Sequence, residues 1–148
     1  MTDDDTRLTE ILTRTRIIAC VGASPNPARP SHYVSLFLQA QGYRVIPVNP
    51  GQAGNTLFGE RAYARLSDIP SVIAVDFVDV FRRSEEVPAV VDEALDALPH
   101  LRTIWMQIGV QHADAARRAE AAGVQVVQNR CPKIDIPRLG LLDHRPAL

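Results

Sequence analysis

The chain has 148 residues, of which 46% are hydrophobic and 22% are charged, and its formal net charge is -1. A chain of this length can bury the core of one globular domain. Because the net charge is close to zero, nothing in the overall charge favours binding to nucleic acid or to an acidic membrane, so any anion site must be local.

Compartment and metal content follow from a few further features. The chain has no run of about 18 apolar residues, which a membrane-spanning helix would need. Its start, MTDDDTRLTE, is too polar and acidic for a signal peptide. Two cysteines, Cys20 and Cys131, form no disulfide framework, and neither they nor the four histidines show metal-ligand spacing. We therefore expect a cytoplasmic protein without a metal site.

In the first half of the chain, Leu8, Ile11 and Leu12 have helical spacing and predict a short amphipathic helix in an N-terminal extension, residues 1–16. The apolar run 17–21 predicts a strand buried on both faces, the first element of a domain that covers residues 17–139. A helix over 31–41 and a second strand over 43–50 follow, and then a loop with a strand-like turn.

In the second half, the apolar run 71–78 predicts a third buried strand, and residues 82–98 predict a helix with Ser84 as a natural N-cap. Residues 101–110 predict a fourth strand, the alanine-rich stretch 112–123 a helix, and residues 124–129 a fifth strand. From Arg130 onwards the prolines favour loop, and residues 140–148 are assigned to a C-terminal tail.

Strands that alternate with helices predict right-handed crossovers and a parallel sheet with helices on both faces. The fold class is therefore a Rossmann-like, doubly wound α/β domain with five parallel strands. We expect the strand order 3-2-1-4-5, with the flavodoxin-like order 2-1-3-4-5 as the alternative. In either order, ligands bind at the C-terminal ends of the strands, which are residues 22–31, 49–51, 76–82, 107–111 and 129–133.

The loop VGASPNPARPSHYV suggests an anion site. The N-terminus of the helix that follows it favours phosphate, Gly22 permits close backbone approach, Ser24 adds a hydroxyl, and Arg29 offers a bidentate donor. The plainer alternative is a strand-to-helix connection without a ligand. The loop is not the G-x-G-x-x-G turn, and the second strand ends at Asn49, where an enzyme that uses NAD has an acid for the ribose.

Three other strand ends carry candidate side chains. Phe81 and Arg82 could hold an adenine ring and a phosphate, or could be a core residue beside a solvated one. Gln107 could orient a ligand through its amide. At the last strand end, flanking cations are expected to lower the pKa of the Cys131 thiol, although a lone cysteine in a loop is more often inert.

Six segments, in the same order, carry a family resemblance: VGASPNPARPSHYV, GYRVIPVNP, LFGERAYARLSDIP, VDVFRRSEEVPAVVDEA, IWMQIGV and VVQNRCPKI. Together they resemble the small stand-alone CoA-binding Rossmann proteins of bacteria, which are similar in fold to the CoA-binding domain of the succinyl-CoA synthetase alpha subunit. The resemblance implies that the loop 22–31 holds CoA phosphates. The chain has no counterpart of the synthetase domain that carries the phosphorylated histidine, so binding is expected and ligase activity is not.

Pattern and resemblance together define one set of candidate ligand-binding residues. They are Gly22, Ala23, Ser24, Pro25, Arg29, Ser31, Asn49, Pro50, Asp76, Phe81, Arg82, Gln107, Gly109, Val110, Asn129, Arg130, Cys131 and Lys133. The role of Asn129 is left open, because this chain has Gln128 and Asn129 where many members of the family that it resembles have a Met and an Asp or Asn.

The leading hypothesis is a non-enzymatic protein that binds CoA or acyl-CoA. One alternative is an NAD(P)-binding protein of the oxidoreductase type on the same fold. The other is a thiol-active protein that uses Cys131, for instance by forming a mixed disulfide with CoA. The sequence identifies neither an acyl group nor a protein partner.

Overall fold

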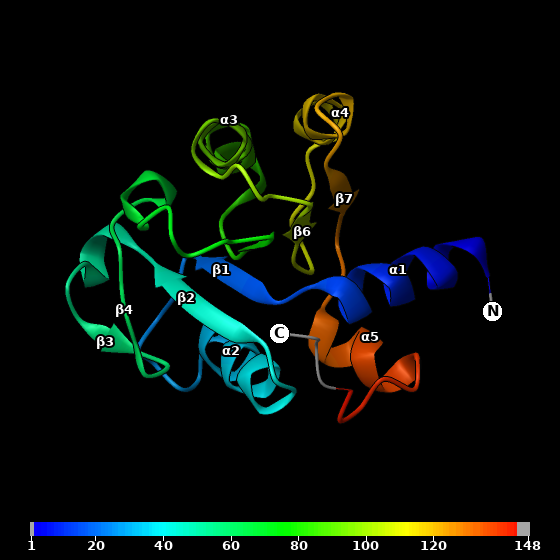
Figure 1. Cartoon of the computed structure of the whole chain (residues 1–148), viewed down its shortest axis with the longest axis horizontal. Helices are drawn as coiled ribbons and strands as arrows, with labels where there is room; N and C mark the ends of the chain where they lie inside the picture. Colours follow the sequence, from blue (N-terminus) through cyan, green and yellow to red (C-terminus); the bar gives the residue numbers. More distant parts are fainter. Residues whose placement is uncertain (1, 145–148) are drawn as a thin grey trace.

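The computed structural model describes residues 2–144 and contains a parallel sheet between two layers of helices (Figure 1). The sheet has five strands: β1 (Ile17–Val21), β2 (Arg44–Val48), β5 (Phe77–Val80), β6 (Thr103–Met106) and β7 (Gln125–Val127). Nearly all of their residues are buried, because helices cover both faces of the sheet. The predicted fold class is confirmed.

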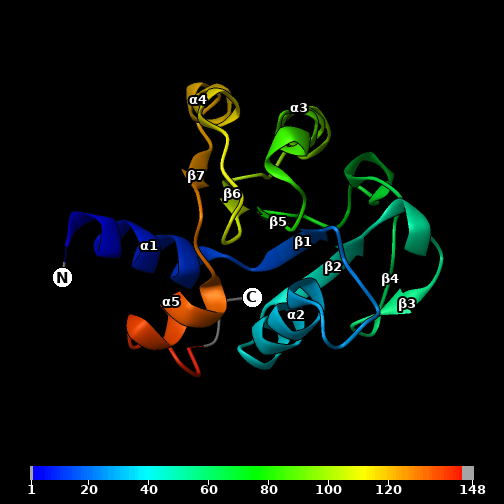
Figure 2. The same ribbon diagram turned by 180° about the vertical axis from the view of Figure 1, so that it is seen from behind.

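Figure 1 and Figure 2 show which helices cover each face. One face carries α1 (Asp3–Arg14), α2 (Pro30–Ala40) and α5 (Pro132–Arg138), and the other carries α3 (Val87–Ala97) and α4 (Ala113–Ala121). The core accordingly has two parts, one on each side of the sheet. None of the helices within residues 2–144 is long and apolar enough to cross a lipid bilayer.

The observed strand order is β2-β1-β5-β6-β7, so the expected order 3-2-1-4-5 is wrong and the flavodoxin-like alternative is correct. The reason lies at the outer edge of β2. There Tyr63 forms a bridge with Val48: its N–H donates to the Pro47 carbonyl, and its own carbonyl accepts from the N–H of Asn49. This segment follows a small hairpin of β3 (Thr56–Leu57) and β4 (Glu60–Arg61). With that edge occupied, the next long strand, β5, pairs with the other side of β1.

The third strand begins later than predicted, at Phe77 rather than at Ser71. This corrects the placement of Asp76, which was expected at the C-terminal edge of the sheet. Its carboxylate instead lies at the N-terminal edge, where it accepts hydrogen bonds from the N–H groups of Arg16 and Ile17 at 3.1 and 3.0 Å. Asp76 therefore links the starts of β1 and β5. It lies at the N-terminal edge of the sheet, whereas the predicted site lies at the C-terminal edge.

Both terminal regions contribute to the packing. Leu8, Ile11 and Leu12 of α1 are buried, as their helical spacing predicts. The expected loop after Arg130 is wrong, because α5 forms there with Pro132 in its first turn, where no backbone N–H is needed. Of the expected tail 140–148, residues 145–148 lie outside the described part of the chain.

Candidate functional site

The site lies where the chain leaves two neighbouring strands in opposite directions. From β1 it runs to α2 on one face, and from β5 it runs to α3 on the other (Figure 1). Diverging connections of this kind leave a crevice at the C-terminal edge of a parallel sheet, where ligands of such folds bind. Three contiguous hollows open in this crevice, and we call them the loop hollow, the apolar cavity and the slot.

The loop hollow has a volume of about 340 Å³ and lies against the N-terminus of α2. Its lining residues are Gly22, Ser24, Arg29, Pro30, Ser31, Asn49 and Phe81. Arg29 is the N-cap of α2 and makes no side-chain capping bond, so the positive end of the helix dipole and one guanidinium face this hollow. The structure thus brings together the first loop, the end of β2 and the end of β5.

The backbone of the first loop is largely committed to internal hydrogen bonds. The N–H groups of Gly22 and Ala23 both donate to the carbonyl of Val48, at 2.9 and 3.3 Å, so they are not free for a phosphate. Ala23 is fully buried. Pro25 is exposed and lies outside the lining of the three hollows. The donors available to an anion here are side chains and the start of α2, not the turn itself.

Asn49 organises this loop. Its Nδ2 donates to the carbonyl of Ala23 at 2.8 Å, and its Oδ1 accepts from the N–H of Gly51 at 3.0 Å. One amide therefore holds the loop after β1 against the turn that follows β2. Asn49 shapes the hollow through these bonds, and the neighbouring Pro50 lines the slot.

Gly22 is required by the packing of the two strand ends. Its φ is +92°, a conformation that residues with a side chain rarely adopt, and a Cβ placed on it would lie 2.8 Å from the Phe81 carbonyl oxygen. That Gly22 also lets a ligand approach the backbone closely stays a prediction. The close approach seen in the structure is to the backbone of the chain itself.

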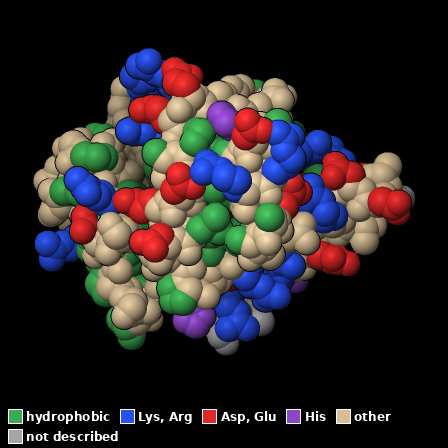
Figure 3. Space-filling view, turned by 90° about the horizontal axis from the view of Figure 1, so that it is seen from above, with side chains coloured by type: hydrophobic (Ala, Val, Ile, Leu, Met, Phe, Trp, Pro, Cys, Tyr) green, Lys and Arg blue, Asp and Glu red, His purple; other side chains and the backbone are tan. Residues whose placement is uncertain are grey.

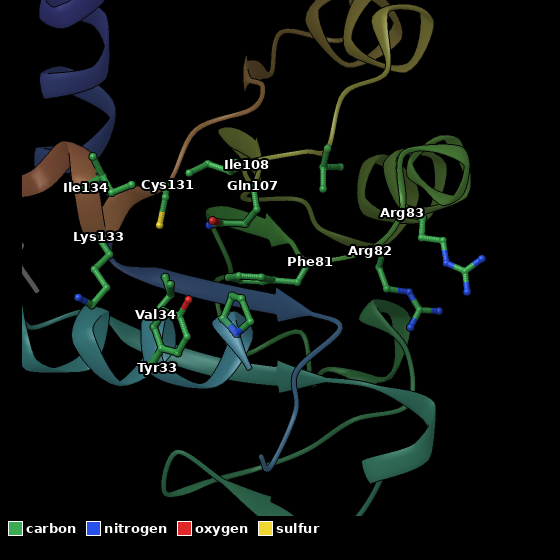
Figure 4. A pocket seen from close by; sticks show the side chains of 12 residues that line it. Tyr33, Val34, Phe81, Arg82, Arg83, Gln107, Ile108, Cys131, Lys133 and Ile134 are labelled. Atoms are coloured by element: carbon green, nitrogen blue, oxygen red, sulfur yellow. The ribbon is translucent and has the colours of Figure 1, made fainter. Parts of the chain in front are cut away.

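The apolar cavity is the largest hollow, with a volume of about 690 Å³. It lies between α2 and α5, and the Gln107 amide, the Phe81 ring and the Cys131 thiol converge on it (Figure 4). Its further lining residues include Tyr33, Val34, Ile108, Val110, Lys133 and Ile134. The apolar side chains of α2 and α5 were not among the predicted residues, because each resembles an ordinary core position until the two helices are placed side by side.

The thiol of Cys131 is neutral rather than activated. Burial raises its pKa, although the backbone N–H groups of Lys133 and Ile134 favour the thiolate. The expected lowering by flanking cations is therefore wrong. Arg130 explains the difference, because its guanidinium donates to both carboxylate oxygens of Asp135, at 2.9 and 2.8 Å, and does not line the cavity. The structure thus places Arg130 in an ion pair outside the apolar cavity, and its predicted role as a ligand-binding cation stays a prediction.

Asn129 and Gly109 belong to the frame of the site. The Oδ1 atom of Asn129 accepts from the N–H of Gly109 at 2.7 Å, and this bond joins the turns after β6 and β7. Neither residue lines the apolar cavity, whereas Val110, their neighbour in the first of these turns, does. At position 129, whose role the sequence leaves open, the structure shows this link between the two turns.

The slot is the smallest hollow, with a volume of about 220 Å³. Val48, Pro50, Ala64 and Val90 give it apolar walls, and the charged side chains beside them are Arg65, Arg82 and Glu93. Arg82 also forms an ion pair of 3.5 Å with Glu86, and its guanidinium points away from Cys131 (Figure 4). A flat, partly apolar ring system with an anionic neighbour matches this lining.

One buried carboxyl beneath the cavity was missed. Asp79 lies in β5, is fully buried, and its Oδ1 accepts a hydrogen bond of 2.7 Å from Nε2 of Gln107. Burial raises the pKa of Asp79 to about 7, against the opposing effect of this bond. The sequence does contain a signal for this residue, because Asp79 stands between two valines in a strand that is buried throughout.

The three hollows lack any group of three or more histidine, cysteine, aspartate or glutamate side chains arranged to hold a metal ion, as does the rest of residues 2–144. On the face of the molecule over α3 and α4, acidic and basic side chains alternate and form no large patch of one charge (Figure 3). The crevice therefore combines a polar hollow at a helix N-terminus with an apolar cavity, at the edge of the sheet where doubly wound α/β domains bind their ligands.

Comparison with known proteins supports this class. The chain matches the CoA binding domain family over residues 16–137. It is 38% identical over 125 residues to "Uncharacterized protein YneT" of Bacillus subtilis, an alignment that covers 84% of this chain and 88% of the relative. A solved structure from Thermus thermophilus is 38% identical with a TM-score of 0.85, and the match covers 94% of this chain and 99% of that one.

A more distant similarity involves a larger enzyme. The dinucleotide-forming acetyl-coenzyme A synthetase 1 of Ca. Korarchaeum cryptofilum is 26% identical with a TM-score of 0.66, over 79% of this chain but only 26% of the enzyme. The family match spans most of the chain. This protein therefore belongs to the CoA-binding domain family.

Proposed function

We propose that the protein binds coenzyme A or an acyl-CoA across the three hollows. The observation that carries this proposal is their continuity: the loop hollow shares Pro30 and Phe81 with the apolar cavity and Gly22 with the slot. Coenzyme A combines a planar base, phosphate groups and a long pantetheine arm, in which amide groups alternate with short alkyl segments and which ends in a thiol. The crevice offers a matching place for each part.

The assignment of the parts follows from charge and polarity. The phosphates fit the loop hollow, because Arg29 and the N-terminus of α2 face it. The adenine ring fits the slot between apolar walls and two arginines. The pantetheine arm fits the apolar cavity and reaches Cys131 at its end.

We further propose that the chain acts as a binding protein and not as a catalyst. The neutral state of the Cys131 thiol disfavours a role as nucleophile, since the thiolate is the reactive form. The NAD(P) alternative is disfavoured by Asn49, whose amide bonds to Ala23 and Gly51 and which offers no acid to a ribose.

A ligand series tests the binding proposal. We expect calorimetry to show binding of CoA, weaker binding of dephospho-CoA if a cation contacts the 3′-phosphate, and little binding of NAD or NADP at the same concentrations. Melting temperatures should follow the same order, because a ligand that binds only the folded state stabilises it by about 2.7 kcal/mol at 100 times its dissociation constant. Tighter binding of either nicotinamide cofactor than of CoA would refute the proposal in favour of the NAD(P) alternative.

A further inference from the structure

Asp79 and Gln107 form a buried polar pair at the base of the apolar cavity. Asp79 is fully buried, while Gln107 is 6% exposed and lines the cavity. Nε2 of Gln107 donates to Oδ1 of Asp79 at 2.7 Å. Within residues 2–144, Oδ2 of Asp79 is buried and has no hydrogen-bond partner. A buried carboxylate with one unused oxygen is costly, and this calls for an explanation.

The surroundings of Asp79 contain no compensating cation in the described part of the chain. From β1, the Cys20 thiol lies opposite Asp79 in the strand register, and from the start of α5 the Cys131 thiol is close enough to be affected by its charge. From β6, the Trp105 indole N–H donates to the Arg130 carbonyl. From α2, Ser35 contributes a buried hydroxyl that acts on the Cys20 thiol. The pKa of Asp79 is therefore determined by burial, which raises it, and by the hydrogen bond from Gln107, which lowers it.

The pair determines which end of the Gln107 amide faces the cavity. A carboxylate only accepts hydrogen bonds, so it requires the NH₂ group of the amide on its side. The amide oxygen, Oε1, then remains for the cavity as an acceptor. A protonated carboxyl group can instead donate to Oε1, and the amide would turn over to present its NH₂ group to the cavity. The charge on Asp79 thus decides whether the amide is held with its oxygen toward the cavity or is free to turn its NH₂ group there.

We propose that Asp79 is a positioning residue whose charge state lets Gln107 distinguish the free thiol of CoA from a thioester. This inference rests on the proposed function and adds a selectivity to it. The two ligands differ at the end of the arm, where a thiol can donate a hydrogen bond and a thioester carbonyl can only accept one. Gln107 and Cys131 line the same cavity and converge there, at the place assigned to the end of the arm (Figure 4).

The selectivity has a definite direction. With Asp79 ionised, the Gln107 oxygen favours the thiol and disfavours the thioester carbonyl. With Asp79 protonated, the exposed NH₂ group favours the thioester. Asp79→Asn has nearly the same shape and can donate to Oε1, so it should behave as the protonated state at every pH.

The orientation of the amide can be tested without any ligand. In ¹⁵N-labelled protein, the side-chain NH₂ signals of Gln107, assigned by their loss in Gln107→Leu, should shift with pH with a midpoint near the pKa of Asp79. The same signals should not titrate in Asp79→Asn. Gln107 signals that are indifferent to pH in the unmodified protein would overturn the inference.

The selectivity is tested by calorimetry with CoA and acetyl-CoA at about pH 5.5 and about pH 8, on either side of the carboxyl pKa. We expect the affinity ratio of CoA to acetyl-CoA to rise about five- to a hundredfold at the higher pH, as one hydrogen bond gained by CoA and one lost by acetyl-CoA would give. Asp79→Asn should keep the low-pH ratio at both pH values. A ratio that does not change with pH in the unmodified protein would overturn the inference. Binding of neither compound, with Gln107 still titrating, would refute the proposed function and leave the role of Asp79 in orienting the amide intact.

Discussion

The side-chain oxygen of Asn129 accepts a 2.7 Å hydrogen bond from the backbone N–H of Gly109, which joins the turns that follow β6 and β7. Asn129 also has a positive φ of 57°, a conformation that asparagine tolerates better than most residues. One residue thus supplies both the bond and the backbone geometry that hold these two loops in place beside the apolar cavity.

These two contributions can be separated by a pair of variants. Asn129→Gly keeps the backbone conformation and loses the bond, which should cost about 1 kcal/mol of unfolding free energy. Asn129→Ala loses both and should cost about 1–2 kcal/mol more. Denaturant unfolding of the two variants measures the difference. Equal stabilities would mean that the positive φ is not strained at this position.

Gly22 should be intolerant of substitution because of the Phe81 carbonyl. Gly22→Ala places a Cβ 2.8 Å from that oxygen at a φ of +92°, and we expect a loss of roughly 2 kcal/mol or more in stability. Gly54→Ala is the matched control, since Gly54 has a similar φ of +85° with nothing within 4 Å. Denaturant melts should show the larger loss at Gly22. Similar losses at both positions would show that the strand ends can separate to admit a side chain.

Arg29 should contribute to ligand affinity through a charged hydrogen bond to phosphate. Arg29→Ala should weaken CoA binding by about 1.5 kcal/mol, the lower end for such a bond, because this side chain is exposed. Arg117→Ala, which removes an exposed arginine of α4 that pairs with Asp114, is the control and should leave the affinity unchanged. Calorimetry on the three proteins decides. The same affinity in all of them would exclude Arg29 from the binding site.

The two cysteines should differ in their reactivity toward thiol reagents. Burial raises the pKa of both thiols, so both should react more slowly than a free cysteine. Cys131 lines the apolar cavity, whereas Cys20 is fully buried in β1, so Cys131 should be labelled first. Saturating CoA should protect it. Mass spectrometry of partially labelled protein measures both rates, and a Cys131 rate unaffected by CoA would place the arm elsewhere.

Asp79 should make stability depend on pH. Its folded-state pKa of about 7 is higher than the ordinary value of 3.8, so the folded protein holds an extra proton between these values. The stability contributed by the protonated carboxyl is complete below about pH 4 and is lost as the pH rises through 7.

The difference in unfolding free energy between the unmodified protein and Asp79→Asn should therefore change by at most about 1.4 kcal/mol per pH unit in this range. Denaturant unfolding of both proteins at a series of pH values isolates this one group. A difference that is flat between pH 4 and pH 8 would show that Asp79 keeps its ordinary pKa.

Local pattern was sufficient for much of the fold. The helical spacing of Leu8, Ile11 and Leu12 identified α1, and the apolar runs identified all five strands of the sheet. The rule that ligands meet the C-terminal strand ends also grouped Gly22, Asn49, Phe81, Gln107 and Cys131 correctly, because parallel strands bring those ends to one edge.

The errors arose where a long-range contact decides the outcome. The strand order depends on Tyr63 occupying the edge of β2, a contact that strand propensity does not reveal. The start of β5 depends on the pairing of Ile18 with Phe77. This start also determines at which edge of the sheet Asp76 lies. Arg130 looks like a free cation in the sequence, but it pairs with Asp135 of α5. The prolines of this segment favour a loop, so the sequence does not predict the helix that brings Asp135 to Arg130.

The partner of Arg130 also connects the site to the start of the chain. Asp135, which is 3% exposed, receives Arg130 on one side and Arg138 at 3.1 Å on the other, and Arg138 pairs in turn with Asp5 of α1 at 2.9 Å. The helix that begins beside Cys131 is thus braced against the first helix. A truncation that removes Asp5 would consequently matter to anyone who measures ligand binding, because it removes an ion pair that supports the helix behind one wall of the apolar cavity.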